Sequence, residues 1–189
     1  MNRPNGLLSL LGAALILAST GTVFGQALPT ATGPGSSVRV GGGISDFRVN
    51  YGQIWLGGGQ LWVDTNPHWR LGMEAEARWP RSSRDPHGPQ QRTYLAGPRL
   101  SLSPGRVEPY IKALAGRGRF IFPFHYATGS YLVFAGGGGV DIHRGRWQIR
   151  ALDLEYQVWP QFTYGRLGQY GVSAGVSYTL LRGASRSVR

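Results

Sequence analysis

The stretch HWRLGMEAEARW, residues 68–79, decides the fold because apolar and charged residues alternate along it. Successive side chains of a strand point to opposite faces, whereas a helix would scatter both kinds around its axis. As a strand, the segment has an apolar face of Trp69, Leu71, Met73, Ala75, Ala77 and Trp79 and a charged face with Arg70, Glu74, Glu76 and Arg78. The alternation therefore predicts a strand that separates two very different environments.

Similar segments follow one another from Val38 onward, and turn-forming residues separate them. The predicted strands are 38–47, 53–63, 67–79, 92–102, 106–118, 130–142, 146–159 and 169–181. Tight links at 65–67, 103–105 and 143–145 alternate with longer ones at 80–91, 119–129 and 160–168. An even number of antiparallel strands, with short turns at one end and longer loops at the other, is typical of outer-membrane barrels. The sequence thus predicts an all-β fold, an eight-stranded antiparallel up-and-down transmembrane β-barrel over 38–182.

Register can be predicted for some strands only. The final strand, QYGVSAGVSYTL at 169–180, alternates without an error. In 147–159 the apolar phase shifts near Ala151 and Leu152, which predicts a β-bulge. Pro98 cannot donate to a ladder, so a local bulge is expected there too. The segment 53–63 is apolar on both faces and predicts no register.

Composition excludes several classes of protein. The chain has no cysteine, which rules out a disulfide scaffold and cysteine-based metal sites. Its net charge is +11, but the bases are 19 arginines and one lysine, dispersed along the chain. No helix-turn-helix, zinc-finger or RNP-like pattern is present, so nucleic-acid binding is not expected.

The N-terminus has the layout of a cleaved secretory signal peptide. Arg3 precedes an apolar run, 7–18, and small residues follow at two candidate cleavage sites, after Gly25 or after Ala27. The run is short for a helix that must cross a hydrocarbon core of about 30 Å. We therefore expect a signal peptide over 1–27, a periplasmic linker over 28–37 and a basic C-terminal tail over 183–189.

Aromatic residues near the strand ends indicate which face meets lipid. At about 3.3 Å per residue and a tilt of about 40°, Trp69 and Trp79 would lie about 25 Å apart along a barrel axis, close to the height of a lipid-facing apolar band. Rings with a polar edge favour membrane interfaces. The predicted interface aromatics are Trp55, Trp69, Trp79, Tyr94, Trp147, Tyr170 and Tyr178.

With the apolar face toward lipid, the charged face fills the interior. The predicted interior charges, six bases and six acids, are Arg39, Arg70, Glu74, Glu76, Arg78, Arg99, Glu108, Lys112, Asp141, Arg150, Asp153 and Glu155. A barrel of eight strands is just wide enough for side chains to fill, so these charges must pair with one another. Glycine runs such as 136–139 would leave room for the long charged side chains.

Together, these features resemble the small OmpA-like outer-membrane β-barrel family. The segments YLAGPRLSL, PYIKALAGRG, GGGGVDIH and IRALDLEYQ look like strands four to seven of that family. The resemblance implies a barrel inserted from the periplasm by the barrel-assembly machinery in a Gram-negative outer membrane. The sequence departs from the family because no peptidoglycan-binding domain follows the barrel and the chain ends in GASRSVR, without a terminal aromatic residue. Tyr178 and Leu180 are the candidates to replace that recognition signal.

The leading hypothesis for function is a non-enzymatic envelope protein, structural or interacting through its loops, with no cofactor or metal and no assigned oligomeric state. Guanidinium groups suit phosphate, so outer-membrane lipid, including lipopolysaccharide, is the expected partner. The candidate phosphate contacts are Arg81, Arg84, Arg92, Arg117, Arg119 and Arg166. Solvated loop charge is the equally weighted alternative.

Three other functions stay open at this point. A small pore is disfavoured by the charge-filled interior. A lipid A-modifying enzyme would draw on His125 with Thr128 or Ser130, but no nearby carboxylate orients the histidine. A soluble lipocalin-like barrel would turn the apolar face inward around a ligand.

Overall fold

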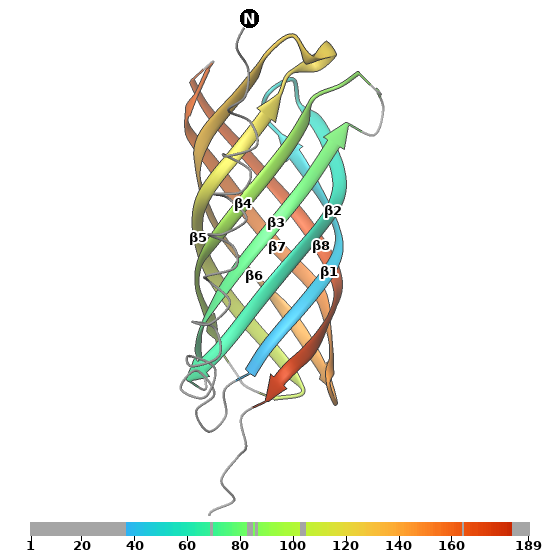
Figure 1. Cartoon of the computed structure of the whole chain (residues 1–189), viewed down its shortest axis with the longest axis vertical. Coiled ribbons are helices and arrows are strands. Elements are labelled where there is room, and N and C mark those ends of the chain that lie inside the picture. The colour runs from blue at the N-terminus through green and yellow to red at the C-terminus, as the bar shows by residue number, and fades with distance from the viewer. Residues whose placement is uncertain are drawn as a thin grey trace, which may run out of the picture.

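The computed structural model describes residues 37–68, 70–82, 85, 87–102, 105–163 and 165–182. Eight long strands account for most of them (Figure 1). The strands are β1 (Ser37–Val49), β2 (Ile54–His68), β3 (Leu71–Ser82), β4 (Gln90–Ser101), β5 (Val107–Ile121), β6 (Thr128–Arg144), β7 (Trp147–Phe162) and β8 (Gly165–Arg182). A short 3-10 helix, η2 (Pro123–His125), lies in the connection between β5 and β6.

The strands form one closed barrel in sequence order, and every neighbouring pair is antiparallel. Closure is made by β1 and β8, which pair from Ser37 and Arg182 to Val49 and Gln169. The predicted fold class is confirmed. Within the part of the chain that the structure describes, no helix is long and apolar enough to cross a membrane.

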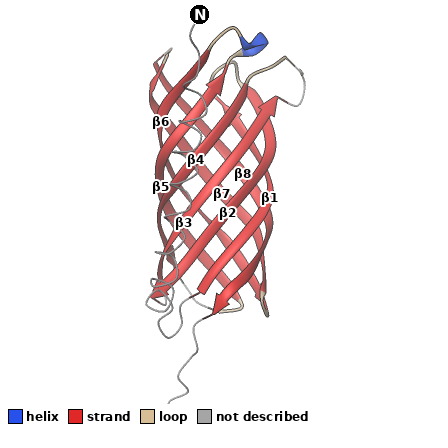
Figure 2. Ribbon diagram, in the orientation of Figure 1, coloured by secondary structure: helices blue, strands red, loops and turns tan. Residues whose placement is uncertain are grey.

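The two ends of the barrel differ (Figure 2). One end carries η2 and the connections β1–β2, β3–β4, β5–β6 and β7–β8, and we call it the loop end. The other end holds the start of β1, the end of β8 and the short connections, and we call it the turn end. The longer links expected at 80–91 and 119–129 lie at the loop end, but the longer link expected at 160–168 is wrong, because β7 continues to Phe162 and β8 begins at Gly165.

Burial alternates along the strands as the sequence pattern requires. In β4, from Gln91 to Ser101, every second residue is buried and the residues between them are exposed. The exposed positions of β3 include Leu71 and Met73, whereas Glu74 and Glu76 are buried. Along β3 the wall of the barrel is therefore apolar outside and charged inside, the reverse of a soluble barrel.

The turn between β2 and β3 lies further along the chain than the sequence suggested. β2 continues to His68 with a register shift after Thr65, so the tight turn expected at 65–67 is wrong. β3 then begins at Leu71. The alternating stretch is a strand from Leu71 to Trp79, while Arg70 lies in the turn.

The two predicted bulges had different outcomes. The register of β7 against β8 shifts between Arg150 and Asp153, which confirms the bulge at Ala151 and Leu152. The register of β4 against β5 is the same on both sides of Pro98, so the bulge expected there is wrong. Proline occupies that position without an extra residue in the strand.

Candidate functional site

The turn-end half of the barrel contains a cluster of buried charged side chains, which we call the charged layer. Its members are Arg39, Asp64, Glu74, Glu76, Arg78, Arg99, Glu108, Lys112, Asp141, Arg150, Asp153 and Glu155. Arg70 was predicted as a member, but it is exposed in the turn before β3. Asp64 was not predicted, because the strand expected at 53–63 ends before it, yet β2 continues to His68 and Asp64 is fully buried. The layer thus holds five bases and seven acids rather than equal numbers.

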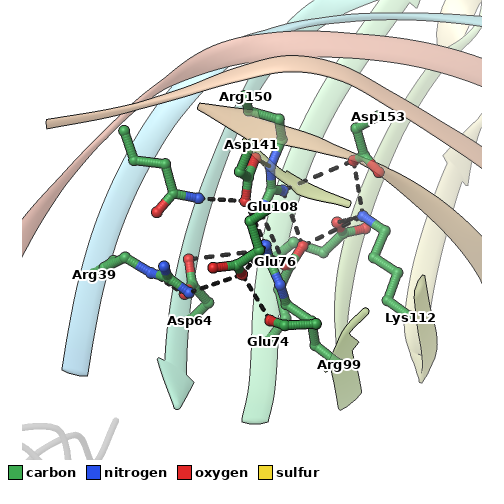
Figure 3. A network of polar contacts seen from close by, with 12 residues as sticks. Arg39, Asp64, Glu74, Glu76, Arg99, Glu108, Lys112, Asp141, Arg150 and Asp153 are labelled. Atoms are coloured by element: carbon green, nitrogen blue, oxygen red, sulfur yellow. Dashed lines mark hydrogen bonds and ion pairs between the residues drawn. The ribbon is translucent and has the colours of Figure 1, made fainter. Parts of the chain in front are cut away.

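Glu74 accepts hydrogen bonds from three bases of the charged layer (Figure 3). Arg150 approaches it with both terminal nitrogens, at 3.0 and 2.9 Å. Arg99 donates to it at 2.9 Å, and the Lys112 ammonium lies 3.3 Å away. Arg99 also pairs with Asp141, so it links two carboxylates of different strands. This bidentate geometry joins β3, β4, β5 and β7 through the interior.

Lys112, the only lysine of the chain, lies among four carboxylates. Its ammonium is 3.0 Å from Glu76, 2.8 Å from Asp153 and 2.9 Å from Glu155. These three carboxylates are close enough together to hold a metal ion. The Lys112 ammonium occupies the position between them, and Arg78 donates to Glu155 and Glu76 from another side. The arrangement is therefore a set of ion pairs in which lysine supplies the cation.

Aromatic rings inside the barrel stack against the arginines, a feature that the sequence analysis missed. The guanidinium carbon of Arg150 lies 4.2 Å from the centre of the Trp62 ring. Arg99 lies 3.7 Å from the Tyr110 ring, and Arg78 lies 4.9 Å from the Phe47 ring. Delocalised guanidinium groups stack on such faces, and desolvation strengthens the contact. The charged layer is thus built from carboxylates, bases and rings together.

Glycines make room for these rings rather than for the charged side chains that we expected. A Cβ atom on Gly41 would lie 2.3 Å from the Trp62 ring, and one on Gly171 would lie 2.5 Å from the Phe47 ring. Likewise, a Cβ on Gly118 would lie 2.4 Å from the ring of Trp159. These close approaches explain why glycine interrupts the strands at inward positions.

Toward the loop end the interior contains an apolar cluster, which the sequence pattern did not predict. The buried residues of this loop-end cluster are Val49, Leu56, Leu95, Leu114, Phe120, Phe122, Val133, Ala135, Trp159, Phe162 and Leu167. The Phe120 ring centre lies 4.8 Å from that of Phe122 and 5.1 Å from that of Phe162, both in edge-on geometry. Such pairs add to the stability of a packed core. The charged layer and the loop-end cluster therefore lie one after the other along the barrel axis.

Outward aromatic residues form pairs near both ends of the strands. Trp55 pairs with Tyr170 and Trp79 with Tyr94 toward the loop end, each with ring centres 6.4 Å apart. Trp147 and Tyr178 pair at 5.1 Å toward the turn end. Trp69 lies outside the described residues. The described members of the predicted set thus pair near both ends of the strands, and their contact with the membrane interfaces stays a prediction.

Several of the predicted lipid contacts lie together on the outer surface near the loop end. We call Arg81, Arg92, Arg117 and Arg119 the arginine patch; all four are exposed. Arg92 lies directly opposite Arg119 in the pairing of β4 with β5, and Arg117 lies opposite Tyr94. Arg166 is exposed at the start of β8, away from the patch, and Arg84 lies outside the described residues.

Other predictions fall where the structure gives no description. The signal peptide over 1–27, nearly all of the linker over 28–37 and the tail over 183–189 lie outside the described residues, as does the side chain of His125. Thr128 and Ser130 are exposed on β6. No side-chain hydrogen bond to a carboxylate is found for either hydroxyl within the described ranges.

Comparisons with known proteins agree on the fold. The sequence matches no protein-family model and no curated protein. Among solved structures, neisserial surface protein A has a TM-score of 0.64 at 11% identity, over 77% of this chain and 97% of that one. The outer membrane protein OprG of Pseudomonas aeruginosa has a TM-score of 0.55 at 10% identity, over 78% and 96%. The N-terminal β-barrel domain of Pseudomonas aeruginosa OprF has a TM-score of 0.54 at 14% identity, over 78% and 99%.

These neighbours are outer-membrane barrels, and at such low identity the likeness establishes the fold of this chain. It agrees with the architecture expected from the OmpA-like resemblance. Membership of that family, beyond the shared architecture, stays a prediction.

Proposed function

We propose that this protein is an outer-membrane β-barrel with a sealed interior and a structural or surface-interaction role in the cell envelope, without enzymatic activity. The observation that carries the proposal is the two-layer filling of the barrel. The charged layer fills the turn-end half, and the loop-end cluster fills the opposite half with packed rings. Paired charges and an apolar constriction both oppose the passage of hydrated ions.

The outer surface supports insertion into a membrane. Large apolar side chains such as Ile44, Leu71 and Leu154 are more than half exposed, at 74%, 56% and 54%. Exposed apolar surface on this scale needs an apolar surrounding, which lipid provides. A lipocalin-like barrel would need these side chains inside, and they point outward. This arrangement favours the membrane over the soluble alternative.

Insertion can be tested on the full-length chain in a Gram-negative host. We expect the protein in isolated outer membranes, and we expect it to migrate differently on an SDS gel before and after boiling, because a closed strand ladder resists detergent. Recovery of the protein in the periplasmic extract, with the same mobility in both samples, would contradict the proposal.

Sealing can be tested by single-channel recording of the purified barrel in a planar bilayer. We expect no steady ohmic conductance, because paired charges and an apolar cluster in series along the axis oppose the passage of hydrated ions. The Phe120→Ala variant should also show no conductance, since it removes one ring from the loop-end cluster and leaves the charged layer unchanged. Steady conductance of the unmodified protein would show that the interior is a pore.

The loop end offers a surface for interaction. Phe124 and Tyr126 are 73% and 62% exposed, and Phe124 has a φ of +54°, unusual for a residue with a side chain. The backbone N–H of Phe124 donates to the carbonyl of His87, and the two rings stack at 5.6 Å. The contact holds an aromatic residue at the tip of the barrel, which supports a role in surface contacts.

A further inference from the structure

The outer wall of the barrel has an apolar groove of about 710 Å³ across β1 to β5. Its floor consists of small side chains, Ala75 and Ala77 on β3, Ala96 on β4 and Ala115 on β5. Larger outward side chains at its edges include Leu61, Val63 and Tyr94. We call this feature the alanine groove. A depression on a lipid-facing wall needs an acyl chain to fill it, because a void there would forfeit dispersion contacts.

The alanine groove ends at the arginine patch. Arg117 lines the groove directly, and Arg119 follows two residues later on the same face of β5. Arg92, on the neighbouring strand, lies directly opposite Arg119. Like charges that face each other across two strands destabilise a sheet unless an anion lies between them. The patch therefore has the geometry of an anion site at the mouth of an apolar groove.

The protein supplies little negative charge to balance this patch. Seven of the nine acidic residues of the chain are buried in the charged layer, which leaves Asp46 and Asp85. The Asp85 carboxylate accepts a hydrogen bond from the backbone N–H of His87, and Asp46 lies on β1. Within the described part of the chain, Arg92, Arg117 and Arg119 form no ion pair or side-chain hydrogen bond. An external anion is the remaining source of balance.

We propose that the alanine groove and the arginine patch form one binding site for an outer-leaflet lipid of the lipid A type. One acyl chain lies in the groove, and the phosphates of the headgroup are held by Arg92, Arg117 and Arg119. The site deepens the proposed function, on which it rests, because it requires the loop end to face the outer leaflet. A multiply phosphorylated headgroup fits better than a single phosphodiester, since several guanidinium groups converge and each can bind bidentately.

The dimensions suit one acyl chain. The groove runs from Val40 on β1 to Arg117 on β5, four strand spacings of about 4.8 Å, or about 19 Å along its length. One leaflet occupies about half of a hydrocarbon core of about 30 Å. With strands tilted by about 40°, a chain that starts at Arg117 and follows the groove toward Val40 would descend about 12 Å along the axis, most of the depth of its own leaflet.

The test is titration of the purified full-length barrel in detergent with lipid A or with phosphatidylglycerol, followed by native mass spectrometry. We expect the unmodified protein to retain lipid A and to bind phosphatidylglycerol more weakly. Arg92→Ala with Arg119→Ala should lower affinity for lipid A at least about tenfold, because charge-assisted hydrogen bonds are lost. Ala77→Leu with Ala96→Leu should lower it by about tenfold by filling the groove.

Matched controls separate this site from general lipid adhesion. Arg106→Ala removes an exposed arginine at the turn end, and Ala151→Leu adds the same bulk to an exposed position of β7. Both should leave lipid A retention unchanged. If the arginine variants lose lipid and the leucine variants keep it, the groove is not an acyl site, although the phosphate contact survives. Equal affinity for phosphatidylglycerol would overturn the assignment to lipid A, and unchanged retention in all variants would overturn the site while leaving the sealed barrel intact.

Discussion

Lys112→Met is expected to lower the free energy of unfolding of the barrel by about 3–5 kcal/mol, the range found when one partner of a buried ion pair is removed. The side chain is fully buried, and its ammonium lies within 3.3 Å of four carboxylates. Methionine matches the length of lysine but brings no charge. The charged layer already holds more acids than bases, so the loss leaves carboxylates facing one another. Urea unfolding in lipid vesicles, followed by gel mobility, measures the change.

Two further variants make this result specific to the charged layer. Arg106→Met removes an exposed base at the turn end and should change stability by less than about 0.5 kcal/mol. Combining Lys112→Met with Glu76→Gln removes one base and one acid together, and it should recover about 0.5–3 kcal/mol of the loss through coupling of neighbours. A Lys112→Met barrel as stable as the unmodified protein would mean that the ion pairs contribute little to stability.

Gly41→Ala is expected to destabilise the barrel by about 1–3 kcal/mol through overpacking. The new Cβ would lie 2.3 Å from the Trp62 ring and 2.7 Å from Cβ of Ser177, so the indole must move. That ring is stacked against Arg150, which in turn holds Glu74 with two hydrogen bonds. A small change at the wall is thus transmitted to the centre of the charged layer. The same unfolding assay measures it.

Gly59→Ala is the matched control, because it makes the same substitution on the neighbouring strand. A Cβ at Gly59 meets no atom within 4 Å, since this position faces outward. Alanine loses less backbone entropy than glycine on folding, so stability should rise by about 0.5–1 kcal/mol. The two variants should therefore have opposite signs. Equal effects would show that strand propensity, and not the space for Trp62, controls the glycine positions.

Strand periodicity explains how much of the site could be predicted. Inward charges on β3 follow an unbroken alternation with outward apolar residues, and those on β7 alternate on each side of one bulge, so Glu74 and Glu155 could be placed inside from their neighbours alone. Asp64 follows the predicted strand 53–63, whose two faces are both apolar, and only its pairing with Arg39 and Glu74 across neighbouring strands reveals its side. Arg70 matches the alternation of β3 in the sequence. It lies in the turn that precedes this strand, however, and is exposed.

Strand periodicity does not predict which aromatic residues point into the barrel. Trp62 and Trp55 are equally apolar in the sequence, yet one stacks on Arg150 inside and the other lies outside against Tyr170. Phe120 and Phe122 lie at the end of β5 and just after it, whereas Phe162 is the last residue of β7, and nothing local indicates that their rings meet. Their packing depends on closure of the barrel, which brings distant strand ends around one axis.

The sequence by itself determined the eight strands, their antiparallel order and the separation of an apolar outer face from a charged inner face, because a period of two residues is a local property of the chain. Tertiary structure alone decided which charges pair, which glycines lie against an aromatic ring, and where along the axis the charged layer ends and the loop-end cluster begins. The same holds for the alanine groove, whose floor comes from separate strands. These features depend on the register between strands, and register is settled only when the barrel closes and every inward side chain must share one narrow space.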